Sequence, residues 1–249
     1  MSEPSRGHAG YGVDAPSIVR NMTLGGVAMI VGGFALGAWL EAAQPTLAAV
    51  ARGWGLFGGL ALLVTAGVML WSSKVGKFIM RDRLLDALAL RGDERVLDVG
   101  CGRGLLLLGA AKRLTTGKAV GVDIWRNEDQ SDNRADATWA NARAEGVADR
   151  VEIKDGDARD LPFADNSFDV IVSSLALHNI PDAGGRAQAI REIARVLKSG
   201  GRVAIFDVAR TDEYARVLGA HGMSDVKRVM GLPLFMSPLA RLVFARKPV

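Results

Sequence analysis

Three glycines at alternating positions follow a short apolar run in this 249-residue chain. The segment reads RVLDVGCGRG and places Gly100, Gly102 and Gly104 directly after the run from Val96 to Val99. A buried strand that ends in a glycine turn lets a ligand approach the backbone closely, because glycine has no Cβ and adopts positive φ easily. The third glycine comes one residue earlier than in the GxGxxG fingerprint of dinucleotide-binding folds, so the spacing argues against a nicotinamide cofactor.

With the acidic residue before it, the turn reads DVGCGRG and closely resembles the first motif of class I S-adenosylmethionine-dependent methyltransferases, an acidic residue followed by GxGxG. In that family the glycine turn passes the amino-acid part of the cofactor. The resemblance implies that Asp98 helps to orient the cofactor's ammonium group, partly through water. It also implies that Gly100, Cys101, Gly102 and Gly104 surround that part of the cofactor, with Cys101 as a small residue in a tight turn.

The resemblance continues in the same order along the chain. The run KAVGVDI (118–124) is expected to be the second strand, and the resemblance implies that its Asp123 binds the two ribose hydroxyls. A carboxylate with two acceptor oxygens suits a vicinal diol. The stretch GDARDLPF (156–163) matches the family pattern GDAxxLPF, which implies that Asp157 binds the adenine amino group and that Ala158 offers backbone to the ring. The implied cofactor-binding residues also include Ile124 and Ser173.

Helical and strand patterns alternate on both sides of these motifs. Helices are expected at 74–91, 105–114, 135–145, 190–197 and 211–222, and further strands at 151–157, 168–176, 202–208, 224–230 and 239–246, the last two as a closing hairpin. Ser199, in KSGG, stands where the family commonly has proline. By resemblance, such a chain forms an α/β Rossmann-like fold, a seven-stranded, mostly parallel sheet with helices on both faces, within a methyltransferase domain at 74–249.

His178 is the candidate catalytic residue. It follows the expected fourth strand, at the sheet edge where ligands bind in such folds. An ordinary histidine pKa near ~6.5 suits a general base at neutral pH. Asp207, at the end of the fifth strand, is a weaker candidate, and the alternative is that His178 only caps a loop or shapes the pocket. Methyl transfer needs alignment above all, and no base is required if the acceptor is already deprotonated or neutral.

The connection after the second strand, WRNEDQSDN (125–133), is longer and more polar than is typical. Two interpretations stay open. The segment is a solvated loop, or several of its side chains cover the cofactor or touch the substrate: Trp125, Asp129, Gln130 and Ser131.

Two uncharged runs precede the expected domain, at 21–40 and 53–73. Each has about the ~20 residues that a helix needs to cross a membrane. The sequence therefore predicts a transmembrane hairpin at 21–73 after a cytoplasmic tail at 1–20. A cleaved signal peptide, two buried core helices and a shallow re-entrant hairpin are the alternatives. GxxxG pairs at Gly33/Gly37 and Gly55/Gly59 let helices pack closely, either on each other or on a second copy in a homodimer.

Basic residues lie before the first span and after the second, whereas the only charged residues in the connection between the spans are Arg52 and Glu41. The positive-inside rule places both termini and the catalytic domain in the cytoplasm, as an integral protein of the cell (inner) membrane. The flanking residues can also meet anionic headgroups. They are Arg6 and Arg20 before the first span, and Lys74, Lys77, Arg81 and Arg83 after the second.

The composition excludes several other functions. A single cysteine rules out a disulfide within the chain, and three dispersed histidines do not suggest a metal site. The net charge of +4 is scattered, and no nucleic-acid motif is present. The anchor favours a lipophilic small-molecule acceptor. The apolar connection 231–238 favours it too if it dips toward lipid or lines the acceptor pocket, and packing in the core is the equal alternative for that connection. A tethered methyltransferase for a protein or soluble metabolite and a non-enzymatic membrane scaffold are the alternatives.

Overall fold

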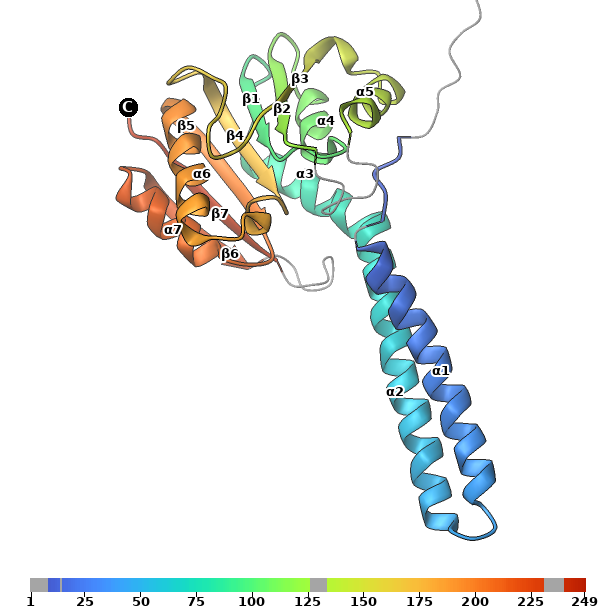
Figure 1. Ribbon diagram of the computed structural model, residues 1–249. Helices are drawn as coiled ribbons and strands as arrows, with labels where there is room; N and C mark the ends of the chain where they lie inside the picture. The colour runs from blue at the N-terminus through green and yellow to red at the C-terminus, as the bar shows by residue number, and fades with distance from the viewer. Residues whose placement is uncertain (1–8, 14, 126–133, 231–239) are drawn as a thin grey trace, which may run out of the picture. The chain divides into compact units, whose positions relative to one another are not determined.

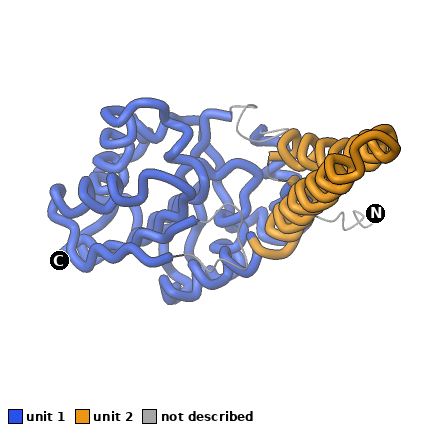
Figure 2. The backbone as a smooth tube through the Cα atoms, turned by 90° about the horizontal axis from the view of Figure 1, so that it is seen from below, with its two compact units in different colours: residues 1–12, 77–249 blue, residues 13–76 orange. Residues whose placement is uncertain are grey.

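The computed structural model describes residues 9–13, 15–125, 134–230 and 240–249. The chain divides into two compact units (Figure 2). One unit is Val13–Gly76, and the other combines Met1–Gly12 with Lys77–Val249. The smaller unit begins eight residues before the expected hairpin at 21–73 and ends three residues after it.

The smaller unit is a helical hairpin. It contains α1 (Pro16–Leu40), α2 (Pro45–Trp71) and a π-helical turn, η1 (Ser72–Gly76). Both long helices begin earlier than the uncharged runs, because a proline in the first turn has no N–H to leave unpaired and starts a helix well. At ~1.5 Å per residue, helices of 25 and 27 residues are about 38 and 40 Å long. By length and composition, the unit therefore has two helices able to cross a membrane.

The glycine pairs hold the two helices of this hairpin together. A Cβ on Gly33 would lie 2.7 Å from the Cα of Gly55, and one on Gly59 would lie 2.5 Å from the carbonyl oxygen of Gly26. Contacts this short are possible only because both helices lack side chains there. Of the two alternatives for the GxxxG pairs, the structure has packing of α1 on α2 within one chain. A homodimer through these helices stays a prediction.

The larger unit is built around a seven-stranded sheet in the order β3-β2-β1-β4-β5-β7-β6 (Figure 1). The strands β1 to β5 run parallel, and β7 is antiparallel to both β5 and β6. This confirms the expected mostly parallel sheet and its closing hairpin. The strands are β1 (Arg95–Val99), β2 (Lys118–Asp123), β3 (Val151–Asp155), β4 (Phe168–Ser174), β5 (Leu197–Asp207), β6 (Ser224–Met230) and β7 (Arg241–Arg246).

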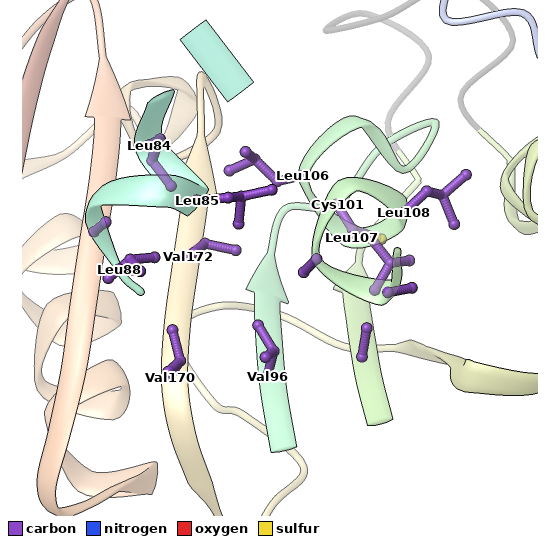
Figure 3. Close-up of a cluster of buried hydrophobic side chains, with 14 of the residues drawn as sticks. Leu84, Leu85, Leu88, Val96, Cys101, Leu106, Leu107, Leu108, Val170 and Val172 are labelled. Carbon is purple, nitrogen blue, oxygen red and sulfur yellow. The ribbon is translucent and has the colours of Figure 1, made fainter. Parts of the chain in front are cut away.

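Helices cover both faces of the sheet. One apolar core lies between the sheet and α3 (Lys77–Ala87), α4 (Leu105–Ala111) and α5 (Ala135–Ala144), and the other lies against α6 (Ala183–Val196) and α7 (Thr211–Ala220). Neighbouring strand residues point into opposite cores, as Val96 and Leu97 of β1 do. Figure 3 shows part of the first core, with Leu85 of α3 near Val172 of β4. Short 3₁₀ turns complete the unit, η2 (Ala148–Arg150) and η3 (Leu177–Asn179).

Two elements begin earlier than expected. Helix α6 starts at Ala183 rather than at 190, because the Asp182 side chain caps it by accepting a hydrogen bond of 2.6 Å from the Gly185 N–H. Strand β5 starts at Leu197 and includes KSGG. This segment forms an irregularity in the pairing of β5 with β4, between the residue pairs Phe168–Leu197 and Val170–Arg202.

The strand order reverses direction between β1 and β4, which are neighbours in the sheet. The connections from these two strands lead to opposite sides, so their carboxyl ends border a crevice where ligands bind in open α/β sheets. The glycine turn follows β1 and the His178 loop follows β4. The fold thus brings the two main chemical motifs of the sequence to one edge.

Candidate active site at the carboxyl edge of the sheet

The glycine turn has the backbone conformation for which glycine is suited. Gly100, Gly102 and Gly104 have φ values of +73°, +47° and +87°, in the left-handed region that other residues rarely adopt. A Cβ on Gly100 would also collide with the Cβ of Ala176, in the loop after β4. The turn and the β4 loop therefore lie in direct contact.

Hydrogen bonds from two neighbouring elements fix the shape of this turn. The Gly102 N–H donates to Asp123 Oδ2 at 2.8 Å, at the end of β2. From α5, the Thr138 hydroxyl donates to the Gly102 carbonyl at 2.6 Å, and the Asn141 amide donates to the Arg103 carbonyl at 2.9 Å. The turn is held in shape by the protein itself, as a preorganised binding loop requires.

Asp98 carries an unsatisfied carboxylate oxygen beneath the turn. The residue is only 2% exposed. Its Oδ2 accepts a hydrogen bond from the Leu107 N–H at 2.8 Å, whereas its buried Oδ1 has no hydrogen-bond partner among the described residues. Burial, with a contribution from the charge of Asp123, raises the pKa of Asp98 to about 7 against the lowering effect of the Leu107 bond. A buried oxygen of this kind fits a cationic ligand group such as an ammonium.

Asp123 is the second acidic residue of the site and is 8% exposed. Besides the Gly102 bond, its Oδ1 accepts a hydrogen bond from the Trp125 N–H at 2.7 Å. Each carboxylate oxygen can accept more than one bond, which is the property that binding a diol requires. Ile124 follows it and is exposed. Trp125 has a φ of +58° and donates from Nε1 to Asp155 Oδ1 at 2.6 Å, whereas the predicted roles of Asp129, Gln130 and Ser131 fall outside the described residues.

The remaining residues predicted to bind the cofactor contact other parts of the protein. Asp157 pairs with Arg159, whose Nη2 lies 2.5 Å from Oδ2, so an adenine amino group must share that carboxylate. Ala158 is half-buried beside it. Ser173 is 1% exposed and donates its hydroxyl to the Val99 carbonyl at 2.8 Å, which ties β4 to β1 below the site. Direct cofactor contacts of these three residues stay predictions.

Cys101 is buried in the turn. Burial, together with the charges of Asp98 and Asp123, raises the pKa of its thiol well above the ordinary value. A buried thiol with a raised pKa is unreactive, because the thiolate is the nucleophile. This agrees with its interpretation as a small residue in a tight turn.

His178 is held by a buried carboxylate. Its Nδ1 lies 2.6 Å from Asp207 Oδ1, and its backbone N–H donates to Asp207 Oδ2 at 3.1 Å. Asp207 is fully buried, and its Oδ2 also accepts a hydrogen bond of 3.2 Å from the Tyr214 hydroxyl of α7. Burial and the nearby Asp207 raise the pKa of Tyr214, which keeps it a neutral donor. The two catalytic candidates of the sequence thus form one unit, a histidine oriented by an aspartate.

Two further residues support this unit, and neither belongs to a sequence motif. Tyr214 reaches Asp207 from another element, and Arg186 of α6 donates to the carbonyls of Ile180 and Pro181 at 2.8 and 2.9 Å, just after His178. The only available signal was the position of Tyr214 on the apolar face of α7. Leu175, directly before the loop, has a φ of +53°, and such strained residues often lie at functional sites.

Comparison with known proteins agrees with this geometry. The profile of the family described as "Methyltransferase domain" matches residues 97–205, from β1 into β5. The chain contains an S-adenosylmethionine-dependent methyltransferase domain. The cofactor of this methyltransferase domain is S-adenosylmethionine, and the glycine turn with the unsatisfied Asp98 oxygen suits its amino-acid part.

The methyltransferase domain is 40% identical over 131 residues to the 27-O-demethylrifamycin SV methyltransferase of Amycolatopsis mediterranei, covering 51% of this chain and 43% of that protein. It is 34% identical over 134 residues to the demethylmenaquinone methyltransferase of Lactiplantibacillus plantarum, covering 53% of each. The chain therefore spans about half the length of the curated relatives it matches.

The fold is also that of solved structures. The crystal structure of the [4+2]-cyclase SpnF superposes with a TM-score of 0.57 at 22% identity, over 69% of this chain and 82% of that one. A fold shared with a cyclase does not determine the reaction, so the chemistry must be argued from the site. Among the described residues, no group of three or more His, Cys, Asp or Glu side chains could hold a metal ion.

Proposed function

We propose that this chain is a membrane-anchored methyltransferase that moves a methyl group from S-adenosylmethionine to a small, lipophilic acceptor, with His178 as general base. One observation carries the proposal. Ala176 packs on Gly100 of the cofactor turn, and His178, two residues further on, is oriented by the buried Asp207. A base is thus positioned beside the turn that receives the methyl donor.

Bound S-adenosylmethionine supplies an activated methyl group on a sulfonium. Asp98 would hold its ammonium group, and Asp123 would hold the ribose diol. With the cofactor bound, His178 would accept the proton of an acceptor hydroxyl as that oxygen receives the methyl group. Nδ1 of His178 lies against Asp207 Oδ1, so Nε2 would be the nitrogen that accepts the proton, and the buried carboxylate would stabilise the imidazolium.

The hairpin serves as the anchor in this proposal. In the most apolar windows of its two candidate spans, only 11% and 17% of residues are buried within the protein, whereas a core helix of a soluble protein is mostly buried. Large apolar side chains point outward, among them Trp39 and Phe57 at 78% and 75% exposure. Lipid is the solvent that such a surface fits. The excess of basic residues outside the spans supports a topology in which the methyltransferase domain and both termini lie in the cytoplasm, at the inner membrane.

The acceptor is a small molecule in this proposal. The relatives reported above bear the names of 27-O-demethylrifamycin SV and demethylmenaquinone methyltransferases, so by name they act on small organic molecules. An anchored enzyme meets acceptors dissolved in or adsorbed to the bilayer at high local concentration. A tethered enzyme for a protein or soluble metabolite is the alternative.

The first experiment measures S-adenosylmethionine binding to the purified full-length chain by calorimetry, with Asp123→Ala and Gly102→Val as controls. Saturable binding that both substitutions abolish supports the cofactor site. Transfer of labelled methyl to a membrane lipid extract, lost in His178→Gln, then supports the acceptor class and the base. Absence of binding by folded wild type would contradict the proposal, and binding without transfer to lipid or soluble acceptors would leave only a scaffold or another reaction.

His178→Gln and Asp207→Asn test the base specifically. We expect each to lower kcat by about 10²–10⁴-fold, because that is the usual contribution of general acid–base catalysis. The cofactor Kd should change little in both. An unchanged kcat in His178→Gln, or an equal loss of cofactor affinity, would contradict the role of base.

A further inference from the structure

The N-terminal segment Ala9–Gly12 packs on the methyltransferase domain, although 64 residues of hairpin separate it in sequence from that domain. The Gly10 N–H donates to Asn141 Oδ1 at 2.8 Å, and the Gly10 carbonyl accepts from Arg103 Nε at 2.6 Å. The Asn141 amide also lies within hydrogen-bond distance of that carbonyl, at 3.3 Å. Gly10 is therefore bound on both its backbone polar groups.

The next residue fixes the segment by burial. Tyr11 is 5% exposed, and its hydroxyl donates to Glu145 Oε1 at 2.6 Å. Its ring meets that of Phe78 edge to face at a centroid distance of 5.5 Å. A buried aromatic ring whose hydroxyl is satisfied is a strong local anchor for an extended segment.

Lys77, the first residue of α3, binds the same segment through hydrogen bonds. It is 6% exposed, and its Nζ donates to the carbonyls of Tyr11 and Gly12 at 3.1 and 2.9 Å. Lys77 is thus not available to lipid headgroups, which corrects its place among the basic residues expected to meet the membrane. Because the hairpin is inserted between Gly12 and Lys77, these bonds join the two points where the chain leaves and re-enters the domain.

The segment is connected to the cofactor turn through one face of α5. Asn141 binds Gly10 and, by its amide, the carbonyl of Arg103, which lies between Gly102 and Gly104 of the turn. Thr138, one turn earlier on the same helix, binds the Gly102 carbonyl. Arg103 itself belongs to the turn and reaches back to Gly10. Displacing the segment would therefore break the bond between Arg103 and Gly10 and remove one partner of Asn141, the residue that holds the turn.

We propose that the segment Ala9–Gly12 is part of the cofactor site, and that Lys77 and Asn141 are positioning residues that hold the glycine turn in its binding conformation through it. The inference rests on the proposed binding of the cofactor at that turn. If it holds, full affinity for S-adenosylmethionine requires the segments on both sides of the hairpin, and a methyltransferase domain that starts at residue 77 would bind the cofactor poorly.

The chain offers its own probe of the turn. Cys101 is the only cysteine and is buried between Gly100 and Gly102. Its rate of alkylation by a maleimide, followed by mass spectrometry, reports how often the turn opens, since a buried thiol reacts only after local opening. The measurement needs no cofactor, so its result does not depend on the proposed function.

A matched control exists at the far end of β7. Lys247 Nζ also binds two backbone carbonyls, those of Ala194 and Leu197 at 2.9 and 2.7 Å, away from the turn. Lys247→Met therefore removes a similar pair of hydrogen bonds from a lysine to backbone carbonyls. Lys77→Met, Asn141→Ala and Lys247→Met are compared as full-length proteins in detergent, each at the same interval below its own Tm.

In Lys77→Met and Asn141→Ala we expect Cys101 to be alkylated about tenfold faster and the S-adenosylmethionine Kd to rise about tenfold, a loss of roughly 1.4 kcal/mol. In Lys247→Met both values stay at the wild-type level. Lys77→Arg restores the wild-type rate, and Tyr11→Phe, which loses only the bond to Glu145, shows a smaller increase and serves if Lys77→Met does not fold.

Wild-type alkylation rates in both Lys77→Met and Asn141→Ala would overturn the inference, as would an equal acceleration in Lys247→Met. Faster alkylation with an unchanged Kd would also overturn it, because the segment would then hold the turn without serving the cofactor. If wild type binds no cofactor, the proposed function fails, while the alkylation rates still decide whether the segment holds the turn.

Discussion

Glycine is concentrated in two regions of this chain and has a different physical task in each. In the hairpin, Gly33 and Gly55 have ordinary helical backbones, and what matters is the missing side chain, since the backbones of α1 and α2 approach too closely for a Cβ. In the turn after β1, Gly100 has both a positive φ and a neighbour in the way. The hairpin glycines allow close helix packing, whereas the turn glycines allow a backbone conformation that suits ligand binding. Substitutions in the two regions should therefore fail in different assays.

The largest expected effect is in the turn. Gly100→Val adds a β-branched side chain at a φ of +73° and against Ala176, so we expect cofactor affinity to fall by at least about 100-fold, or ~2.7 kcal/mol. Calorimetry on the folded variant measures this. Retention of the hairpin is checked by its partition into membranes, and a Kd near that of wild type would show that the turn does not carry the cofactor.

The next effect is in the hairpin. Gly33→Val places a side chain against the Cα of Gly55, and we expect overpacking to destabilise α1–α2 association by about 1–3 kcal/mol. Reduced resistance of the hairpin to denaturing detergent measures the loss. The variant must keep the wild-type cofactor Kd at low temperature, and Gly32→Val, at a position with open space around it, is the matched control.

A smaller expected effect is a dependence of cofactor affinity on pH, which arises at Asp98 beneath the turn and has no counterpart in the hairpin. Because burial raises the pKa of Asp98 to about 7, the carboxyl is largely protonated in the free protein below that pH and must lose its proton to hold an ammonium group. Cofactor affinity should fall by up to about tenfold per pH unit as the pH drops below 7, with release of a proton on binding. Calorimetry in buffers of different ionisation enthalpy measures the proton, and Asp98→Asn should bind weakly at every pH, without that slope.

The smallest effect concerns the residue between two of these glycines. Cys101 packs its sulfur near Gly121 of β2, and its raised pKa keeps the thiol protonated. Cys101→Ala should cost about 1 kcal/mol of stability from lost packing and change kcat less than about twofold. Thermal unfolding and steady-state assays measure the two quantities. A large loss of kcat would contradict the interpretation of Cys101 as a passive residue.

The fold and the glycine turn could be predicted because their signals are local. A run such as VLDVGCGRG contains both the buried strand and the turn that ends it, and the alternation of helical and strand patterns determines the order of the layers. The supporting network could not be predicted in this way. Tyr11 and Glu145 are 134 residues apart in sequence, and polar pairs between distant segments leave no periodic pattern. For the same reason His178 and Asp207 were separate candidates, although their side chains meet.

The bond between Gly10 and Asn141 spans 131 residues, and this sets an order of events during synthesis. At ~5–20 residues per second, the ribosome makes the N-terminal segment roughly 7–26 seconds before it makes Asn141. The hairpin is complete within that interval and can enter the bilayer while α5 does not yet exist. Contacts of such long sequence separation form late and slowly. In the proposed membrane-anchored enzyme, the newly made chain is therefore committed to the membrane first and becomes able to bind its methyl donor tightly only afterwards.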